Sequence, residues 1–186
     1  MNNTEYAVAI AKELERTVLQ IDAESGERLT DVILSSKRIF AAGAGRSGFM
    51  VKAFVMRLMH MGFESYMVGE TITPNIGVGD ILVIGSGSGE TGSLVSMAQK
   101  AKKIGSTIAL VSIFAESTIG KLADVIVKIP APTPKINTDT GFKSIQPMGS
   151  LFEQSLLLTL DAVILRLMEK RGGDSDTMFS RHANLE

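Results

Sequence analysis

Two short segments of this 186-residue chain, residues 81–84 (ILVI) and 108–111 (IALV), are apolar at every position. A strand with one face in water alternates apolar and polar residues, whereas a parallel strand covered by helices on both faces does not. Strand-like runs recur along the chain, and helical patterns separate most of them. The strands are expected at residues 38–42, 65–68, 80–85, 106–111 and 124–129, and the helices among them at 47–61, 90–104 and 117–122. This alternation predicts an α/β fold with a five-stranded, doubly wound parallel sheet.

Further helical patterns flank the sheet. Residues 5–35 carry an apolar stripe with a break near Ser25-Gly26, which predicts two helices or one bent helix. A long C-terminal helix is expected at residues 150–170, before Gly172-Gly173. Residues 130–147 hold four of the five prolines and predict a long irregular loop. We expect a single domain over residues 1–186: N-terminal helices at about 5–35, a flavodoxin-like core at about 37–170 and a polar tail at 171–186.

The composition excludes several functional classes. The net charge is −1 and no dense basic block is present, so nucleic acid is not an expected partner. The chain has no cysteine and only two histidines, so we expect no metal site. Charges interrupt the N-terminal segment, and the longest apolar run, residues 156–168, is too short to span a membrane. These features predict a cytoplasmic protein with a small ligand and no membrane partner.

Two loops rich in glycine and hydroxyl side chains each follow a predicted strand and lead into a predicted helix. They are residues 43–48 (GAGRSG) and 86–91 (SGSGET). Glycine lets the backbone approach an anion closely, and free amides at a helix start bind phosphate without lysine. Both loops fall at the carboxyl ends of strands, where ligands of doubly wound sheets bind. The predicted substrate-binding residues are Gly45, Ser47, Ser86, Gly87, Ser88, Gly89, Glu90 and Thr91.

Each loop also has a simpler explanation. Residues 43–48 match the dinucleotide pattern G-x-G-x-x-G, and Glu70 lies where a ribose-binding acid is expected, although the chain is short for two nucleotide-binding halves. The same loop is compatible with a tight structural turn. A helix N-cap would explain one hydroxyl of residues 86–91 but not all three. Glu90 would repel a phosphate, so we expect its carboxylate to face helix amides or sugar hydroxyls.

Two of the predicted helices are unusually apolar. Residues 47–61 and 150–170 leave few polar positions, and one sheet cannot cover so much apolar surface. The sequence therefore predicts a homo-oligomer.

Several segments together resemble the 6-phospho-3-hexuloisomerases of the sugar isomerase (SIS) family. These are residues 43–48, 57–60 (RLMH), 69–74 (GETITP), 85–91 and the ending 181–186 (RHANLE). The resemblance covers the whole chain and implies an SIS fold, a tetramer and no cofactor. It implies conversion of D-arabino-3-hexulose 6-phosphate, a phosphorylated ketohexose, to fructose 6-phosphate in the ribulose monophosphate route of formaldehyde fixation or detoxification. Another SIS aldose–ketose isomerase and a non-catalytic phosphosugar sensor are the alternatives.

The reaction needs one carbon base. Moving a ketone from C3 to C2 requires removal of the C2 proton, an enediolate and reprotonation at C3, and one base can serve both carbons. By resemblance this proton acceptor is Glu153, in the motif at residues 149–154 (GSLFEQ). From the residues alone, Ser150-Leu151-Phe152-Glu153 is also a capping box that opens the apolar helix.

The two histidines are the remaining catalytic candidates. His60 lies on a mostly apolar helix, where a core or interface histidine is at least as common as a catalytic one. His182 lies on the polar tail, where fraying is the ordinary expectation. The resemblance favours a catalytic role for His182, because a histidine that titrates near neutrality can shuttle protons between O2 and O3. In an oligomer it can do so across a subunit boundary.

Overall fold

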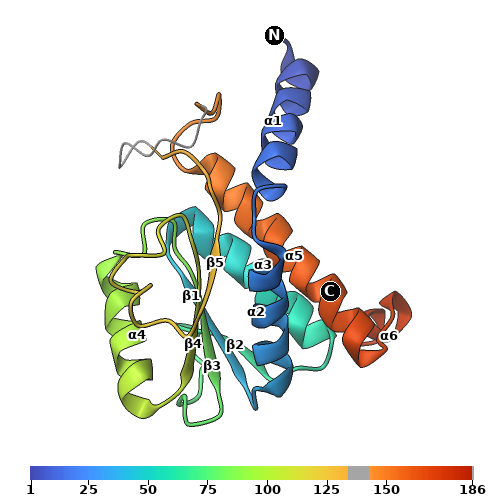
Figure 1. Ribbon diagram of the computed structural model, residues 1–186. Helices are drawn as coiled ribbons and strands as arrows, with labels where there is room; N and C mark the ends of the chain where they lie inside the picture. The colour runs from blue at the N-terminus through green and yellow to red at the C-terminus, as the bar shows by residue number, and fades with distance from the viewer. Residues whose placement is uncertain (134–142, 186) are drawn as a thin grey trace.

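The computed structural model describes residues 1–133 and 143–185, and its centre is one five-stranded sheet (Figure 1). The strands are β1 (Ile39–Gly43), β2 (Ser65–Met67), β3 (Ile81–Gly85), β4 (Thr107–Ser112) and β5 (Val125–Lys128). All neighbouring strands are parallel, in the order β2-β1-β3-β4-β5. The predicted α/β class is confirmed, and each strand begins and ends within one residue of the predicted position.

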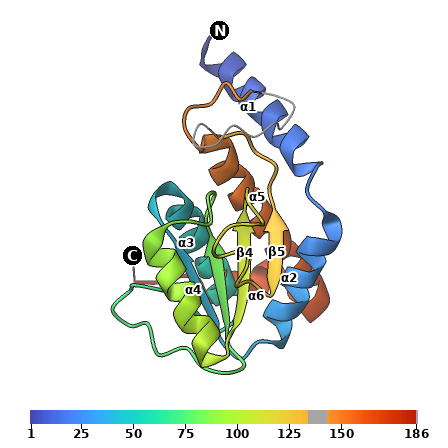
Figure 2. The same ribbon diagram turned by 60° about the vertical axis from the view of Figure 1, so that its left-hand side comes forward.

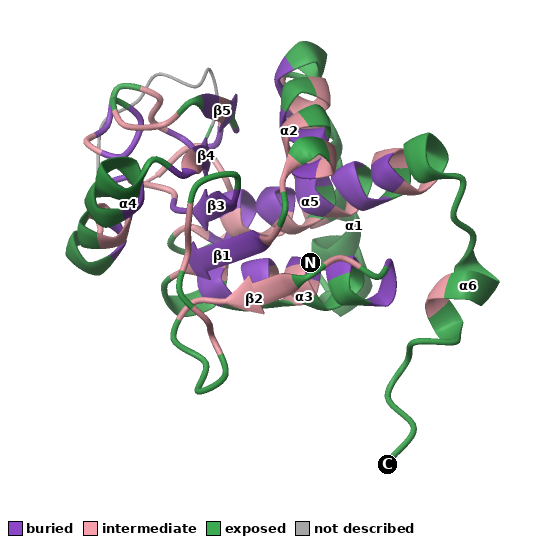
Figure 3. Cartoon of the chain, turned by 90° about the horizontal axis from the view of Figure 1, so that it is seen from below, coloured by how far each residue is buried: buried purple, intermediate pink, exposed green. Residues whose placement is uncertain are grey.

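The central strands are buried on both faces, as their apolar runs predict. Alternate residues enter two separate cores, because successive side chains of a strand point to opposite faces. Val83 and Ala109 belong to the core under α2 (Ala23–Ser35), α3 (Gly45–His60) and α5 (Ser150–Arg171). Leu82 and Ile108 belong to the core under α4 (Gly92–Ile104). Figure 3 shows α4 on one side of the sheet and the other three helices across from it.

The N-terminal region forms two helices, but their boundary differs from the prediction. Helix α1 (Asn3–Val18) and α2 are separated at residues 19–22, and Gly26 lies inside α2. The prediction of a break at Ser25-Gly26 was wrong because Asp22 is the N-cap: its carboxylate accepts hydrogen bonds from the amides of Glu24 and Ser25. Ser25 thereby belongs to the first turn of the helix.

Helix α1 projects from the body of the molecule and contacts the chain just before α5 (Figure 2). The carboxylate of Glu13 accepts hydrogen bonds from the Ser144 hydroxyl, the Ile145 amide and the Gln146 side chain. Burial opposes the charged form, but these bonds outweigh it and lower the pKa of Glu13. The contact fixes the entry to α5.

The C-terminal part differs from the prediction in two places. Residues 117–122 form turns and not a helix. Residues 171–186, expected as a polar tail, contain the short helix α6 (Ser175–Phe179). The predicted loop at 130–147 lies partly outside the described residues, which omit 134–142 and 186. No helix in the described part of the chain is both long and apolar enough to cross a membrane.

Gly48 allows α3 to start directly against β1. A Cβ atom built on Gly48 would lie 2.8 Å from the carbonyl oxygen of Gly43, so Gly48→Ala should lower the free energy of unfolding by about 1–3 kcal/mol through overpacking. Gly26→Ala is the matched control, because nothing lies within 4 Å of its added Cβ atom, and should raise stability by about 0.5–1 kcal/mol. Urea unfolding measures both, and equal stability of Gly48→Ala and wild type would contradict the packing argument.

Candidate active site

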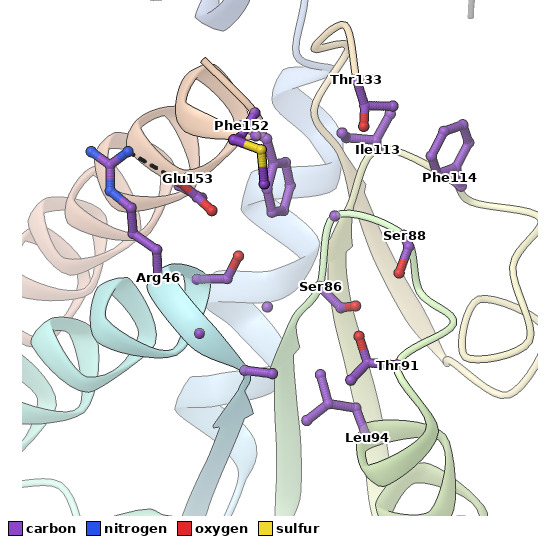
Figure 4. A pocket seen from close by; sticks show the side chains of 17 residues that line it. Arg46, Ser86, Ser88, Thr91, Leu94, Ile113, Phe114, Thr133, Phe152 and Glu153 are labelled. Atoms are coloured by element: carbon purple, nitrogen blue, oxygen red, sulfur yellow. Dashed lines mark hydrogen bonds and ion pairs between the residues drawn. The ribbon is translucent and has the colours of Figure 1, made fainter. Parts of the chain in front are cut away.

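A pocket of about 330 Å³ lies where β1 and β3 end. These strands pair in register down to Gly43 opposite Gly85, so the loops that follow them start side by side. The chain adds β2 on one side of β1 and β3 on the other side, so the strand order switches between β1 and β3. Doubly wound sheets bind their ligands at such a switch point. The two glycine loops line the pocket together with the start of α5 (Figure 4). The predicted meeting of the two loops is therefore observed.

Three helices begin at this pocket, and none of them has a side-chain cap. The N-caps are Ala44 for α3, Thr91 for α4 and Gly149 for α5, and none donates or accepts a capping side-chain hydrogen bond. The other helices in the described part of the chain have side-chain caps, from Asn2, Asp22 and Asp174. Uncapped first turns present free amides and the positive end of the helix dipole. The pocket is therefore built to attract an anion.

The loop at residues 86–91 combines hydroxyls with open amides. The Ser86 and Ser88 hydroxyls accept hydrogen bonds from the amides of Gly89 and Glu90, which leaves each O–H able to donate. The amides of Gly87, Ser88 and Thr91 have no hydrogen-bond partner within residues 1–133 and 143–185. These donors can surround a phosphate group.

Two residues of this loop do not line the pocket. Glu90 turns away, and its carboxylate accepts a 2.7 Å hydrogen bond from the Thr118 amide, which lowers its pKa. Its partner is thus a loop amide, and not the helix amides or sugar hydroxyls that were expected. Gly89 has φ +62°, and a Cβ atom there would lie 2.0 Å from the Ser117 hydroxyl oxygen. Both residues lie on the side of the loop away from the pocket, next to residues 117–118, and fix the conformation of the loop.

Glu153 lies in the first turn of α5, at the pocket wall. Arg46 Nη1 donates to Glu153 Oε2 at 3.2 Å and to the Ser150 hydroxyl at 2.7 Å. The predicted capping box is therefore not formed, because Gly149 is the N-cap and both polar side chains face Arg46. Arg46 and Glu153 lie on one side of the pocket, and Ser86, Ser88 and Thr91 lie on the other (Figure 4). The arrangement can hold an anionic group at one end and a proton acceptor at the other.

His60 and His182 meet in a second, open cleft of about 490 Å³. Their rings stack with centroids 5.4 Å apart, and Arg57 Nη1 lies 3.2 Å from His60 Nδ1. Arg181 donates to the His60 carbonyl, so the C-terminal segment packs against the end of α3. Asp161, also in this cleft, has a pKa raised by burial.

The histidine cleft and the pocket share no lining residue. Arg46 and His60 stand at opposite ends of α3, which separates them by about 20 Å along the helix axis. Within one chain, the predicted catalytic residues thus fall into two groups: Glu153 at the pocket, and His60 with His182 at the cleft.

Comparison with known proteins gives the family. The SIS domain model matches residues 32–158. The chain belongs to the SIS family. The 3-hexulose-6-phosphate isomerase of Bacillus subtilis (strain 168) is 55% identical to it over 186 residues, with all of both chains covered. The Mycobacterium gastri enzyme of the same name is 40% identical over 178 residues, covering 95% of this chain and 88% of that one.

A solved SIS-type structure from Methanococcus jannaschii has the same fold. It superposes with a TM-score of 0.84 at 33% identity and covers 98% of this chain and 99% of that one. A molecular function of 3-hexulose-6-phosphate isomerase was inferred for that protein. The resemblance stated from the sequence motifs is thereby confirmed.

Sequence reasoning missed several pocket residues of this SIS chain. Arg46 was overlooked although it is the one charged residue within residues 43–48. Phe152 packs against Gly87, where an added Cβ atom would lie 3.1 Å from its ring. Met148 lies at the entry to α5 with φ 57°, a conformation uncommon for residues other than glycine. No sequence pattern identifies the last two as pocket residues.

Two further observations concern the dinucleotide and metal interpretations of the sequence. Glu70, the candidate ribose-binding acid, pairs with Lys52 at 2.7 Å and does not line the pocket. Within residues 1–133 and 143–185, no three acidic or histidine side chains are grouped to hold a metal ion.

The histidine cleft makes stability depend on pH. Burial, then the Arg57 charge, then His182 lower the pKa of His60 in the folded protein. The unfolded chain binds this proton with a pKa of about 6.5, so it holds more protons than the fold as pH falls through that value. Acidification from about pH 7.5 to about 5.5 should therefore reduce the contribution of His60 to the free energy of unfolding, whereas the raised pKa of Asp161 acts in the opposite direction. His60→Gln should lose less stability over this interval in urea unfolding, and an equal loss in both proteins would refute the assignment.

Proposed function

We propose that this protein is a 3-hexulose-6-phosphate isomerase, which interconverts D-arabino-3-hexulose 6-phosphate and fructose 6-phosphate within one SIS domain spanning residues 1–186. The observation that carries the proposal is the pocket itself, with Glu153 across from a phosphate-binding loop. Its support is the 55% identity, over the full length, to an enzyme of that name. No cofactor is needed, because the reaction moves a carbonyl within one molecule.

In this proposal the phosphate binds at the α4 start. The hydroxyls of Ser86, Ser88 and Thr91 and the open amides of Gly87 and Ser88 donate to its oxygens, and the helix dipole favours its charge. Gly45 and Ser47 hold the sugar from the β1 side of the pocket. Gly89 and Glu90 act indirectly, by holding the loop in shape.

The carbon chain then extends toward Glu153. Its carboxylate removes the C2 proton of the 3-hexulose, and the C–H electrons form a C2=C3 double bond while the C3 carbonyl becomes an oxyanion. The O2 proton moves to O3. Glu153 returns its proton to C3, and the electrons at O2 form the new carbonyl. Atoms and charge balance, since C2 is oxidised and C3 is reduced in the same molecule.

The transfer between O2 and O3 is the step where His60 or His182 would act. Within one chain both lie too far from Glu153, so a catalytic histidine must come from a second copy of the chain. The oligomer proposed below would provide it.

We also propose that the protein is a homotetramer in the cytoplasm. The assembly of several copies is supported by apolar side chains that are exposed at seven-residue spacing on two adjacent helices. They are Phe49 and Met56 on α3, and Leu158 and Leu165 on α5. Residues seven apart lie on the same side of a helix, so each helix presents an apolar edge to solvent. Cell fractionation tests the location.

A coupled assay for fructose 6-phosphate formed from the 3-hexulose tests the function. Glu153→Gln should lower turnover by about 10²–10⁴, because glutamine cannot accept a carbon-bound proton. Its unfolding free energy should stay nearly unchanged, because the Arg46 pair it loses is partly exposed. Glu169→Gln, another arginine-paired glutamate of α5, is the control. Near-normal turnover in Glu153→Gln would mean that the base lies elsewhere, and no product with wild type would end the proposal.

Light scattering tests the oligomer and should give a multiple of 19.9 kDa, fourfold for a tetramer. Leu165→Lys should lower this mass, because it places a charge on the proposed interface without altering the core, Leu165 being 66% exposed. Ile72→Lys, on an exposed loop, should not change the mass. A wild-type monomer at low micromolar concentration would contradict the proposal.

A further inference from the structure

Arg46 makes a contact that fold stability does not explain. Its guanidinium joins two helix starts, donating from Nη1 both to Ser150 and to Glu153. The Arg46 side chain is 48% exposed, and ion pairs this open to solvent contribute at most about 1 kcal/mol. Because Arg46 lines the pocket and stabilises the fold only slightly, we look for its role in ligand binding or catalysis.

The remaining donors of Arg46 are free. Within residues 1–133 and 143–185, its Nε and Nη2 have no hydrogen-bond partner. They lie beside the uncapped first turns of α3 and α5, whose amides and dipoles also favour negative charge. One edge of the guanidinium thus holds Glu153 and the other edge is available to a ligand.

We propose that Arg46 is a catalytic residue that binds the two oxygens of the enediolate intermediate. The inference rests on the proposed function and concerns the same pocket. When Glu153 takes the carbon proton, one negative charge moves from its carboxylate to the substrate oxygens. Arg46 contacts the Glu153 carboxylate, which loses the negative charge in this step. The same guanidinium can therefore donate hydrogen bonds to O3 and then to O2, with little movement, as the charge develops on them. The planar fork of a guanidinium suits two adjacent oxygens, which an ammonium group cannot match.

Two other roles make different predictions. Arg46 as a phosphate ligand is disfavoured by its position, since it lies with Glu153 and away from Ser86, Ser88 and Thr91 (Figure 4). Arg46 as a simple support for Glu153 would require only a positive charge at this place, which lysine also supplies. Enediolate binding requires the planar, two-pronged guanidinium group. Its loss should lower kcat more than it weakens ligand binding.

The experiment compares Arg46→Gln and Arg46→Lys with wild type. Turnover is followed with fructose 6-phosphate, together with exchange of its C3 proton for deuterium in heavy water. Binding is measured by calorimetry with glucitol 6-phosphate, an open-chain phosphate that has no carbonyl and forms no enediolate. Lys52→Gln is the matched control, because Lys52 also lies on α3, is half exposed and pairs with a glutamate. Ser88→Ala is the control for loss of phosphate binding.

We expect Arg46→Gln to lower turnover and C3 exchange by about 10²–10³, the range for losing one oxyanion donor. Glucitol 6-phosphate should bind as in wild type, whereas Ser88→Ala should weaken it. Arg46→Lys should restore only part of the turnover, and Lys52→Gln should match wild type.

Three results would overturn the inference while leaving the proposed function intact: normal turnover in Arg46→Gln, full turnover in Arg46→Lys, or weakened glucitol 6-phosphate binding with kcat retained. If wild type itself neither converts fructose 6-phosphate nor exchanges its C3 proton, the proposed function fails, and the inference fails with it.

Discussion

The paired ends of β1 and β3 are the constraint on which the site depends. Gly43 and Gly85 face each other in the ladder, and neither position has room for a side chain. A Cβ atom on Gly85 would lie 2.6 Å from Val51 on α3 and 3.0 Å from Leu156 on α5. Glycine at these strand ends lets both helices pack close against the sheet. As a result, the first turns of α3 and α5 stand beside the loop that leads into α4.

Three helix N-termini converge on the pocket, so much of its positive electrostatic potential comes from backbone amides and helix dipoles. The chain has a net charge of −1, so its composition does not attract anions. A missing side-chain cap costs about 0.5–2 kcal/mol where the N-cap is alanine, as at Ala44, and much less where it is glycine, as at Gly149. The helices away from the pocket all keep their caps. Among the described helices, side-chain caps are thus missing only at the pocket, where an anionic ligand could take their place.

The parts of the structure predictable from sequence are those that local chemistry decides. Apolar runs such as residues 81–84 located the strands, and glycine loops located the pocket, because burial on two faces and tight turns restrict the residue types allowed. Ser150 and Glu153 could not be interpreted this way. Their spacing suits a capping box, but Arg46, more than 100 residues earlier in the chain, engages both side chains. Glu90 was misjudged for the same reason, since its partner Thr118 lies in a distant loop. A short polar motif defines which contacts are possible, and the tertiary fold selects among them.

Helices α3 and α5 connect the pocket to the outer surface of the molecule. Both begin at the pocket, and both reach the histidine cleft, where Arg57 and Asp161 face His60 and His182. Their exposed apolar edges lie between these two ends. A second chain packed on those edges would contact the same two rigid helices whose first turns hold Arg46 and Glu153. Within one chain, Arg46 and Glu153 lie at the helix starts, whereas the histidines lie at the other end of α3, about 20 Å away along its axis. In the proposed mechanism, a histidine that moves the proton between O2 and O3 would therefore belong to a second chain, and only that step should depend on assembly.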